Sequence, residues 1–255
     1  MTLDPSTGDV ELRQRDAGAG PSGFALDSAD ELIELVGVSR VYVAGLVHAV
    51  NDVSLAVHRG EFLAIAGPSG SGKTTLLNLM SGLDRPTTGS VRFDGVEPAG
   101  PRDWARLRAA KVGFVFQAFH LLPALSALEN VQVPMFGTAR PSSERASRAL
   151  DLLQQVGLSS KIARRPDELS AGEQQRVAIA RSLANGPGVL LADEPTGNLD
   201  TRNAAAILEL LIDLRRTQGL AMVVVTHNPD VARRADRAVD IVDGRIAGPG
   251  ARSMG

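Results

Sequence analysis

The sequence contains no cysteine, which excludes disulfide bonds and thiolate metal ligands and is typical of a cytosolic protein. Aromatic residues make up only 4% of the chain. Positive charge is not in excess either, because 27 Lys+Arg residues against 29 Asp+Glu residues leave a formal net charge of −2. A chain without a basic excess has no strong electrostatic attraction to nucleic acid, so we expect no nucleic-acid partner.

No apolar run approaches the roughly 20 residues that a membrane-spanning helix requires. The longest run, residues 220–225, has the length and branching of a buried parallel strand. Residues 1–29 lack the basic start and apolar core of a secretory signal, and their Gly, Pro, Asp and Ser content predicts a disordered tail. We expect residues 248–255 to be flexible as well, and residues 30–247 to form the folded domain of a soluble protein.

Segments with strand and helix patterns alternate along the expected domain. Strands are predicted at residues 31–42, 49–57, 61–67, 89–95, 113–117, 188–194 and 220–227. Helices are predicted at residues 72–81, 141–157, 170–185, 201–218 and 229–235. This alternation predicts an α/β fold with a mostly parallel, doubly wound sheet. Residues 119–166 show helical patterns and no convincing strand, so we interpret them as a helical insertion.

The segment GPSGSGKTT matches the P-loop pattern G-x-x-x-x-G-K-[ST], and it follows an apolar strand and opens a helix, as the motif requires. Its glycines let consecutive backbone N–H groups point at phosphate oxygens. Lys73 is expected to reach the terminal phosphates, and the Thr74 hydroxyl is expected to bind Mg²⁺. The expected nucleotide-binding residues of the loop are Gly67, Pro68, Ser69, Gly70, Ser71, Gly72, Lys73, Thr74 and Thr75.

An acidic pair ends the strand predicted at residues 188–194. Ligands bind at the carboxyl ends of strands in open α/β sheets, so Asp193 and Glu194 are expected to face the P-loop. Asp193 would join the Mg²⁺ shell, and Glu194 would polarise the attacking water. The alternative is that the pair caps a helix after Pro195. A kinase-like phosphoryl transferase and a hydrolase both fit the motifs considered so far.

The segment LSAGE, residues 169–173, contains a second candidate anion site. Ser170 and Glu173 have the S-x-x-E spacing of a capping box, which predicts that a helix begins here. The exposed N–H groups at Ala171 and Gly172 would attract an anion. A chain that already has a P-loop does not need this second site for the same phosphate.

Several motifs, in this order, resemble those of the nucleotide-binding subunits of ABC transporters. They are the P-loop, Gln117 after GFVF, LSAGE, the acidic strand, GNLD and VVVTHN, and the resemblance extends over about residues 31–246. It favours a hydrolase and implies ATP and Mg²⁺ as cofactors. It also implies a P-loop NTPase core, an N-terminal antiparallel β subdomain and a helical subdomain at about residues 119–186.

The resemblance further implies that two copies pack head to tail, so that each copy's LSAGE segment contacts the terminal phosphate held by the other copy's P-loop. The residues of this contact would be Ser170, Ala171, Gly172 and Glu173. Asp200 would lie at the dimer seam and could also cap the helix from Thr201. The family usually has glycine at the position of Ala171, and the added methyl group could weaken closure of the dimer.

Three further roles follow from the resemblance. Gln117 would complete the Mg²⁺ and water shell, and His227 would contact the terminal phosphate and hold the geometry of the water. Tyr42 would stack on adenine, although ordinary strand packing is an alternative for this residue. The other histidines match no motif and are interpreted as surface or packing residues: His48, His58 and His120.

The segments GLDRPTTGSVRFDG, FQAFHLLPALSALENVQVP and ADEPTGNLD resemble the subgroup that drives lipoprotein release, macrolide export and, in one relative, cell division. This implies a membrane permease partner and a peripheral position on the inner face of the cell membrane. We expect docking at an apolar loop formed by Phe119, Leu121, Leu122, Pro123 and Leu125. The alternative is that these residues pack under the helical insertion.

Three functions are compatible with these motifs. The first is the energising subunit of an exporter or extractor, and the second is a regulatory ATPase that signals across the membrane. The third, a soluble ABC ATPase that acts on DNA or ribosomes, is disfavoured by the single nucleotide domain and by the net charge of −2.

Overall fold

The computed structural model describes residues 30–42 and 47–247, so the disorder expected for residues 1–29 and the flexibility expected for 248–255 lie outside the described residues. The strands are β1 (Glu31–Tyr42), β2 (Val47–His58), β3 (Phe62–Ala66), β4 (Thr88–Phe93), β5 (Val112–Val115), β6 (Val189–Asp193), β7 (Ala221–Thr226), β8 (Arg237–Val242) and β9 (Arg245–Ile246). The helices are α1 (Lys73–Ser81), α2 (Pro101–Lys111), α3 (Ala127–Gln132), α4 (Ser142–Gln155), α5 (Ala171–Ser182), α6 (Thr201–Gln218) and α7 (Pro229–Arg234), with 3-10 helices η2 (Val133–Met135) and η3 (Pro166–Glu168).

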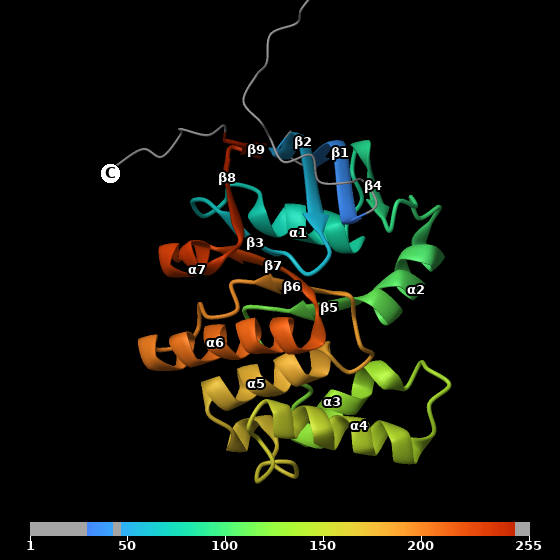
Figure 1. Cartoon of the computed structure of the whole chain (residues 1–255), viewed down its shortest axis with the longest axis vertical. Coiled ribbons are helices and arrows are strands. Elements are labelled where there is room, and N and C mark those ends of the chain that lie inside the picture. The colour runs from blue at the N-terminus through green and yellow to red at the C-terminus, as the bar shows by residue number, and fades with distance from the viewer. Residues whose placement is uncertain (1–29, 43–46, 248–255) are drawn as a thin grey trace, which may run out of the picture.

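A six-stranded sheet in the order β5-β6-β7-β3-β8-β9 forms the centre of the molecule (Figure 1). The pairs from β5 to β8 are parallel, and only β8 and β9 pair antiparallel. Because the P-loop strand β3 lies between β7 and β8, it is hydrogen-bonded on both edges. The predicted mostly parallel sheet is therefore confirmed.

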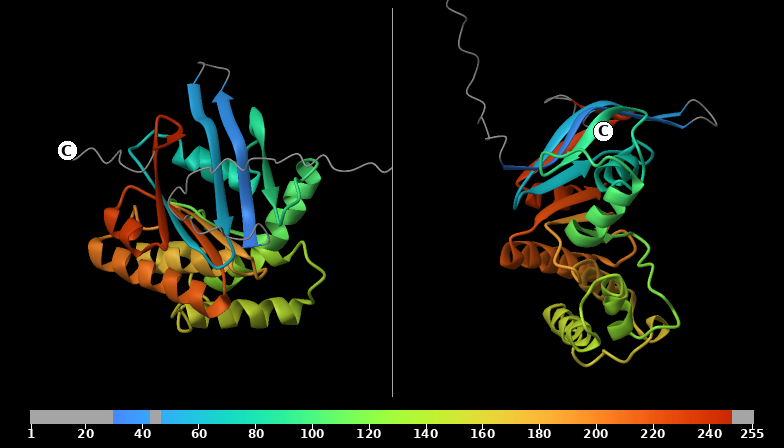
Figure 2. Two further views of the ribbon diagram at one scale, coloured as in Figure 1. Left: turned by 45° about the horizontal axis from the view of Figure 1, so that its top comes forward. Right: turned by 90° about the vertical axis from the view of Figure 1, so that its right-hand side faces the viewer.

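A second, three-stranded sheet has the order β2-β1-β4 and is antiparallel, as the resemblance implied. Its strands lie across the P-loop helix α1, which separates them from the six-stranded sheet (Figures 1 and 2). Apolar side chains of β1 and β2 alternate with more exposed ones, because only one face of this sheet packs against α1.

The two faces of the six-stranded sheet belong to different cores. Side chains of alternate residues such as Leu191 and Val223 pack with those of α1 and the antiparallel sheet. Their neighbours Leu190 and Met222 pack with α4, α5 and α6 on the other face. The right-hand view of Figure 2 shows these layers, with α4 beyond α5 and α6. Helices α1 and α5, which carry the two candidate anion sites at their N-termini, therefore lie on opposite faces.

Three observed elements were not predicted. Helix α2 buries only Trp104, so its sequence has no apolar stripe. Strand β8 carries Arg237 and Asp240 and is only partly buried, and β9 has two residues. Helix α2 and strand β9 lack an apolar pattern on which a prediction could rest, and in β8 the short apolar run is interrupted by Asp240.

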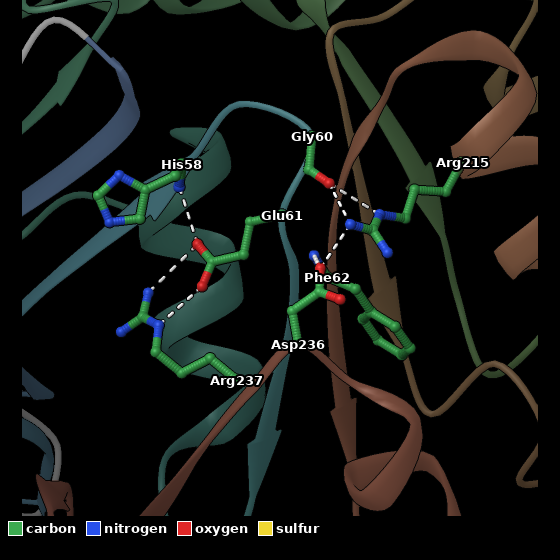
Figure 3. A network of polar contacts seen from close by, with 7 residues as sticks. All are labelled: His58, Gly60, Glu61, Phe62, Arg215, Asp236 and Arg237. Atoms are coloured by element: carbon green, nitrogen blue, oxygen red, sulfur yellow. Dashed lines mark hydrogen bonds and ion pairs between the residues drawn. The ribbon is translucent and has the colours of Figure 1, made fainter. Parts of the chain in front are cut away.

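A polar network holds the end of β3 that is farther from the P-loop (Figure 3). The carboxylate of Glu61 accepts the His58 N–H and pairs with the Arg237 guanidinium, with 2.7 Å between Oε1 and Nε. Asp236 accepts the N–H of Phe62 at 2.8 Å and also pairs with Arg215. Arg215 in turn donates to the Gly60 carbonyl. The network joins the β2–β3 turn to the end of α6 and the start of β8.

Among the described residues, no helix combines the length and the apolar character that a membrane crossing requires.

Candidate functional site

The P-loop curls between β3 and α1. Lys73 is 7% exposed, and its ammonium donates to the carbonyls of Gly67 (2.9 Å) and Pro68 (2.8 Å). Two glycines allow close backbone approach. A Cβ at Gly67 would lie 2.2 Å from the Ile241 carbonyl oxygen, and a Cβ at Gly72 would lie 2.0 Å from the Ala49 oxygen. Any side chain at either position would displace backbone, so this loop conformation requires glycine there.

The end of β6 is joined to the start of α1 by one hydrogen bond. The Thr74 hydroxyl donates to the Asp193 carboxylate at 3.1 Å, so Asp193 faces the P-loop as expected. Burial raises the pKa of the Asp193 carboxyl, and the charge of Glu194 raises it further, while Thr74 and Lys73 oppose the shift. A nearby cation would stabilise the charged form of this carboxyl. The Thr74 hydroxyl beside the Asp193 carboxylate also offers the oxygen ligands that Mg²⁺ prefers.

Glu194 follows β6 with a positive φ of 46°, which is unusual for a residue that is not glycine. Its N–H donates to the Val225 carbonyl at 3.0 Å. Its carboxylate lies 2.8 Å from Nδ1 of His227, and the side chains are 15% and 65% exposed, respectively. The left-handed backbone therefore holds a mostly buried carboxylate against the more accessible imidazole. Strained backbone of this kind occurs often at functional sites.

Glu194 and His227 line a cavity of about 540 Å³ between the loop after β6, α6 and α7. The P-loop faces a different cavity of about 450 Å³, whose lining includes Lys73 and Thr74. The two linings share no residue, and the bond between Thr74 and Asp193 lies between them. One copy of the described chain thus holds the phosphate loop and the acidic–imidazole pair in adjoining but separate cavities.

Gln117 does not bond with Thr74 or Asp193 in the described structure. Its side chain lies 3.4 Å from Oδ1 of Asn198, and Asn198 donates to the Gln117 carbonyl at 2.9 Å. The segment after β5 is therefore connected to the GNLD turn. Sequence reasoning assigned no role to Asn198, although its position inside the GNLD motif was the available signal.

The segment LSAGE begins α5 as predicted. Ser170 accepts the Glu173 N–H, and the Glu173 carboxylate accepts the Ser170 N–H at 2.9 Å, so the capping box is confirmed. The N–H of Ser170 lowers the pKa of the Glu173 carboxyl. Ala171 is exposed at the first helical position, so its methyl group points away from the chain's own core.

Asp200 caps α6 and lies near the start of α5. Its carboxylate accepts the Asn203 N–H at 2.9 Å, and this bond lowers the pKa of the Asp200 carboxyl. A Cβ at Gly172 would lie 3.0 Å from Oδ1 of Asn203. The N-termini of α5 and α6 are therefore in contact, and the cap that was considered for Asp200 is present.

Gln175, which sequence reasoning also missed, is fully buried in α5. Its amide donates to the Pro195 carbonyl at 2.7 Å, directly after Glu194. Its own carbonyl oxygen has no partner among the described residues. In the sequence, a polar residue on the apolar face of the predicted helix could have identified Gln175 as a site residue. The bond connects the LSAGE helix to the turn that carries Glu194.

Tyr42 is not among the residues that line the P-loop cavity. Its hydroxyl donates to Asp84 at 2.8 Å, and the Arg40 guanidinium lies over its ring, 4.6 Å from the centroid. Arg40 pairs with the same Asp84 carboxylate. One ring face is therefore in contact with Arg40, and stacking on adenine stays a prediction.

Several residues without predicted roles also line the P-loop cavity, and two of them have ionisable side chains. His48 enters it from β2, where we had interpreted it as a surface or packing residue, and Asp243 enters it from the turn between β8 and β9. No motif marks either residue. Their position follows from the pairing of distant strands, which the local sequence does not encode.

The side chains of Arg181 and Asn130 hold the loop after Gln117 in place. Arg181 donates to the carbonyls of Phe119 (2.8 Å) and His120 (2.6 Å), and burial lowers the pKa of its guanidinium. Asn130, fully buried, accepts the Leu122 N–H at 2.8 Å and donates to carbonyls of the same loop. Leu121 packs against the core, whereas the Leu122 side chain is 46% exposed. The alternative of packing under the helical insertion is therefore confirmed for Leu121, whereas docking at this loop stays a prediction.

An aromatic groove of about 470 Å³ borders this loop. It is lined from β5, α2, η2, the end of α5 and the loop itself, and it includes Phe114, Phe116 and His120. The two phenyl rings stack with centroids 4.2 Å apart, and the imidazole meets Phe116 edge-on at 4.9 Å. Exposed apolar surface around such a groove is typical of an interface.

Comparisons with known proteins point to the same family as the sequence motifs. A family model described as ABC transporter matches residues 50–197, which include the P-loop, Gln117, Ser170 and Glu194. The lipoprotein-releasing system ATP-binding protein LolD of Anaeromyxobacter dehalogenans is 51% identical over 87% of this chain and 95% of its own length. The macrolide export ATP-binding/permease protein MacB of Nitrosomonas europaea is 49% identical over 84% of this chain, which spans 33% of MacB.

A solved structure is also similar. The ATP-binding cassette MJ0796, as a dimer in a post-hydrolysis state bound to ADP and Pi, matches with a TM-score of 0.79 and 40% identity. The match covers 88% of this chain and all of that chain. With a P-loop, an acidic strand end and a capped LSAGE helix in one α/β domain, the chain belongs to the ABC transporter family, as one of its ATPases.

Proposed function

We propose that two copies of this chain close head to tail over two Mg-ATP, and that the closure drives a membrane permease. The observation that carries the proposal is the placement of the two anion sites on opposite faces of the six-stranded sheet. The LSAGE helix caps itself through Ser170 and Glu173 and exposes Ala171 at its first position, while the P-loop helix α1 of the same chain lies on the other face of the sheet. A second copy supplies the phosphate that the LSAGE helix would bind. The dimeric state of MJ0796 supports this arrangement.

In this proposal the P-loop binds the phosphates, with Lys73 leaving the Gly67 and Pro68 carbonyls to contact them. Thr74 and Asp193 would hold Mg²⁺, which neutralises phosphate charge when bound. Gln117 would join them by leaving Asn198. Glu194 accepts a proton from the attacking water, and His227 keeps the carboxylate in place through its 2.8 Å contact.

The remaining roles concern the nucleoside and the seam. Tyr42 would stack on adenine with the ring face that Arg40 leaves open. Asp200 would lie at the seam between copies while it caps α6. The exposed Ala171 and its neighbour Gly172 would meet the partner's nucleotide through backbone N–H groups, and Ser170 through its hydroxyl, which would leave the Glu173 carboxylate to do so.

A mixture of two inactive variants tests the head-to-tail arrangement. Lys73→Ala removes the P-loop ammonium, and Ser170→Arg obstructs the LSAGE surface, so each variant alone is expected to be inactive. In a mixed dimer one site combines the intact P-loop of one copy with the intact LSAGE of the other. ATPase activity is therefore expected to recover to as much as about a quarter of wild type, since half the dimers are mixed and each has one intact site.

The control is the same mixture with Lys73→Ala and Ser170→Arg combined in one chain and wild type as the other. That mixed dimer retains no intact composite site, so wild-type copies paired with the double variant are silenced, and activity should fall to about a quarter of that of the same total amount of wild type, below the half that simple dilution would give. If the two single variants fail to restore activity although mixed dimers form, the two motifs serve the same chain's nucleotide and the head-to-tail proposal is wrong.

We further propose that a permease segment docks in the aromatic groove beside the loop after Gln117. The loop carbonyls are fixed by Arg181 and Asn130, so the exposed Leu122 is presented on a rigid support. Because Gln117 contacts Asn198 within the GNLD turn, movement at the nucleotide would reach this loop directly. The name of MacB, which joins an ATP-binding protein and a permease, supports a partner of this kind.

Leu122→Glu is expected to abolish recovery of the permease while leaving basal ATPase activity within about twofold, because Leu122 is solvent-exposed and lies outside both cavities. The measurement is co-purification with tagged protein from detergent-solubilised native membranes. Leu150→Glu is the matched control, since Leu150 is 42% exposed on α4 against 46% for Leu122. Equal permease recovery with both variants would contradict docking at this loop.

The recovered partner would also separate the two membrane functions. A permease with a large outer domain bound to cargo indicates export or extraction, in line with LolD and MacB. A partner that binds an outer-surface enzyme and no cargo indicates the regulatory alternative. In either case the chain would act at the inner face of the membrane through its partner.

A further inference from the structure

The turn between β8 and β9 contacts the P-loop at Ser71. Asp243 and Gly244 form this turn with φ angles of 48° and 74°, the left-handed values of a two-residue hairpin. The Gly244 N–H donates to the Ser71 carbonyl at 3.0 Å, and the Gly244 carbonyl accepts the Asn51 N–H at 2.8 Å. The turn is thus bonded at once to the P-loop and to β2.

Three backbones meet at this point without an intervening side chain. A Cβ at Gly244 would lie 3.0 Å from the Ala49 oxygen and 3.2 Å from the His48 oxygen. The Ala49 oxygen is also the atom that excludes a Cβ at Gly72. The Ala49 carbonyl therefore fits between the turn and the P-loop, and one methyl group at Gly244 would require either this carbonyl or the turn bonded to Ser71 to shift.

The bond to Ser71 determines where the next N–H points. In a trans peptide the carbonyl and the N–H lie on opposite sides. Because the Ser71 carbonyl is bonded to Gly244, the plane of the Ser71–Gly72 peptide is fixed, and with it the direction of the Gly72 N–H at the phosphate cavity that Gly72 and Gly244 both line. A P-loop binds phosphate through such N–H groups, so their direction determines its affinity.

We propose that Gly244 is a positioning residue for nucleotide binding: its N–H holds the Ser71 carbonyl and thereby aims the Gly72 N–H at the phosphates. The proposal rests on the P-loop as the nucleotide site. It gives the β8–β9 turn, which no motif marks, an effect on affinity. The turn contacts neither Glu194 nor His227, so the hydrolysis step itself should be little affected.

The chain contains its own control for this proposal. Asp94 and Gly95 form a second Asp-Gly turn with φ angles of 51° and 74°. A Cβ at Gly95 would meet no heavy atom within 4 Å in the described part of the chain. Alanine at Gly95 and at Gly244 therefore imposes the same backbone strain, but only at Gly244 does it also collide with Ala49.

The test compares Gly244→Ala with Gly95→Ala in the full chain. ADP affinity is measured by calorimetry, and KM and kcat are measured for ATP. Gly244→Ala is expected to weaken ADP binding and raise KM by roughly tenfold, the loss of about one aligned hydrogen bond. Its kcat at saturation should stay within about twofold. Gly95→Ala should lower the melting temperature through the same backbone strain, to a smaller extent because its Cβ meets no neighbour, and should leave ADP affinity unchanged.

Gly244→Asn guards against misfolding, because asparagine accepts left-handed backbone more readily and still adds the Cβ. Equal ADP affinity in folded Gly244→Asn and Gly95→Ala would overturn the proposal, as would a fall in kcat without a change in KM. Lys73→Ala is measured beside them. If it binds ADP normally, the P-loop assignment has failed, whereas lost binding there with normal binding at Gly244→Asn refutes only the role of Gly244.

Discussion

Glu194→Gln is expected to slow ATP hydrolysis by roughly 10²–10⁴-fold, the usual contribution of a positioned general base, while ATP affinity stays within about twofold of wild type. Glutamine keeps the size of the side chain and can still bond with Nδ1 of His227, which lies 2.8 Å from the carboxylate. It cannot accept a proton from water. The phosphate cavity should be unaffected, since Glu194 does not line it.

The measurement is single-turnover hydrolysis together with calorimetric ATP binding. Glu209→Gln is the matched control, because Glu209 lines the same cavity as Glu194 but pairs with Arg234 at 2.7 Å. Normal turnover in Glu194→Gln would remove Glu194 from the role of base. Slow turnover in both variants would show only that the cavity tolerates no amide.

Lys73→Ala is expected to weaken ATP binding by roughly 10²–10⁴-fold, as two charge-assisted hydrogen bonds to phosphate are lost at about 1.5–3 kcal/mol each. The same ammonium holds the Gly67 and Pro68 carbonyls in the described structure, so its removal also leaves the empty loop less ordered. Both effects lower affinity and neither depends on hydrolysis.

Calorimetry with ADP and with a non-hydrolysable ATP analogue checks this prediction. Lys111→Ala serves as the control, because Lys111 is an exposed lysine at the end of α2. Thermal unfolding without nucleotide shows whether the variant is folded. A folded Lys73→Ala chain that binds ADP with wild-type affinity would contradict the assignment of GPSGSGKTT as the nucleotide site.

The P-loop helix, the capped helix at Ser170 and the strand before Asp193 could be predicted from the sequence because each is specified locally. A glycine-rich turn, an S-x-x-E spacing or a short apolar run carries its own signal within a few residues. The order of these motifs also identified the family, which the comparisons confirm.

Contacts between distant segments could not be predicted in this way. The bonds of Tyr42 with Asp84 and of Gln117 with Asn198 join residues 42 and 81 positions apart. The junction at Gly244 depends on β8 lying beside β3, and the short run of residues 238–242, interrupted by Asp240, does not specify which strand β8 pairs with. In each case the side chains suit several partners, and only the pairing of strands selects one.

The central position of β3 has a consequence during synthesis. Phe62 at its start bonds with Asp236, 174 residues later in the chain, and β3 is bordered by β7 and β8. At the usual 5–20 residues per second, the ribosome needs roughly 9–35 s to supply these neighbours after β3 is made. Until β7 is made, β3 has no partner in the sheet, and until the β8–β9 turn is made the P-loop cavity lacks Asp243 and Gly244. A nascent chain that stalls before β8 would therefore leave one edge of β3 open to chaperones and its nucleotide site unfinished.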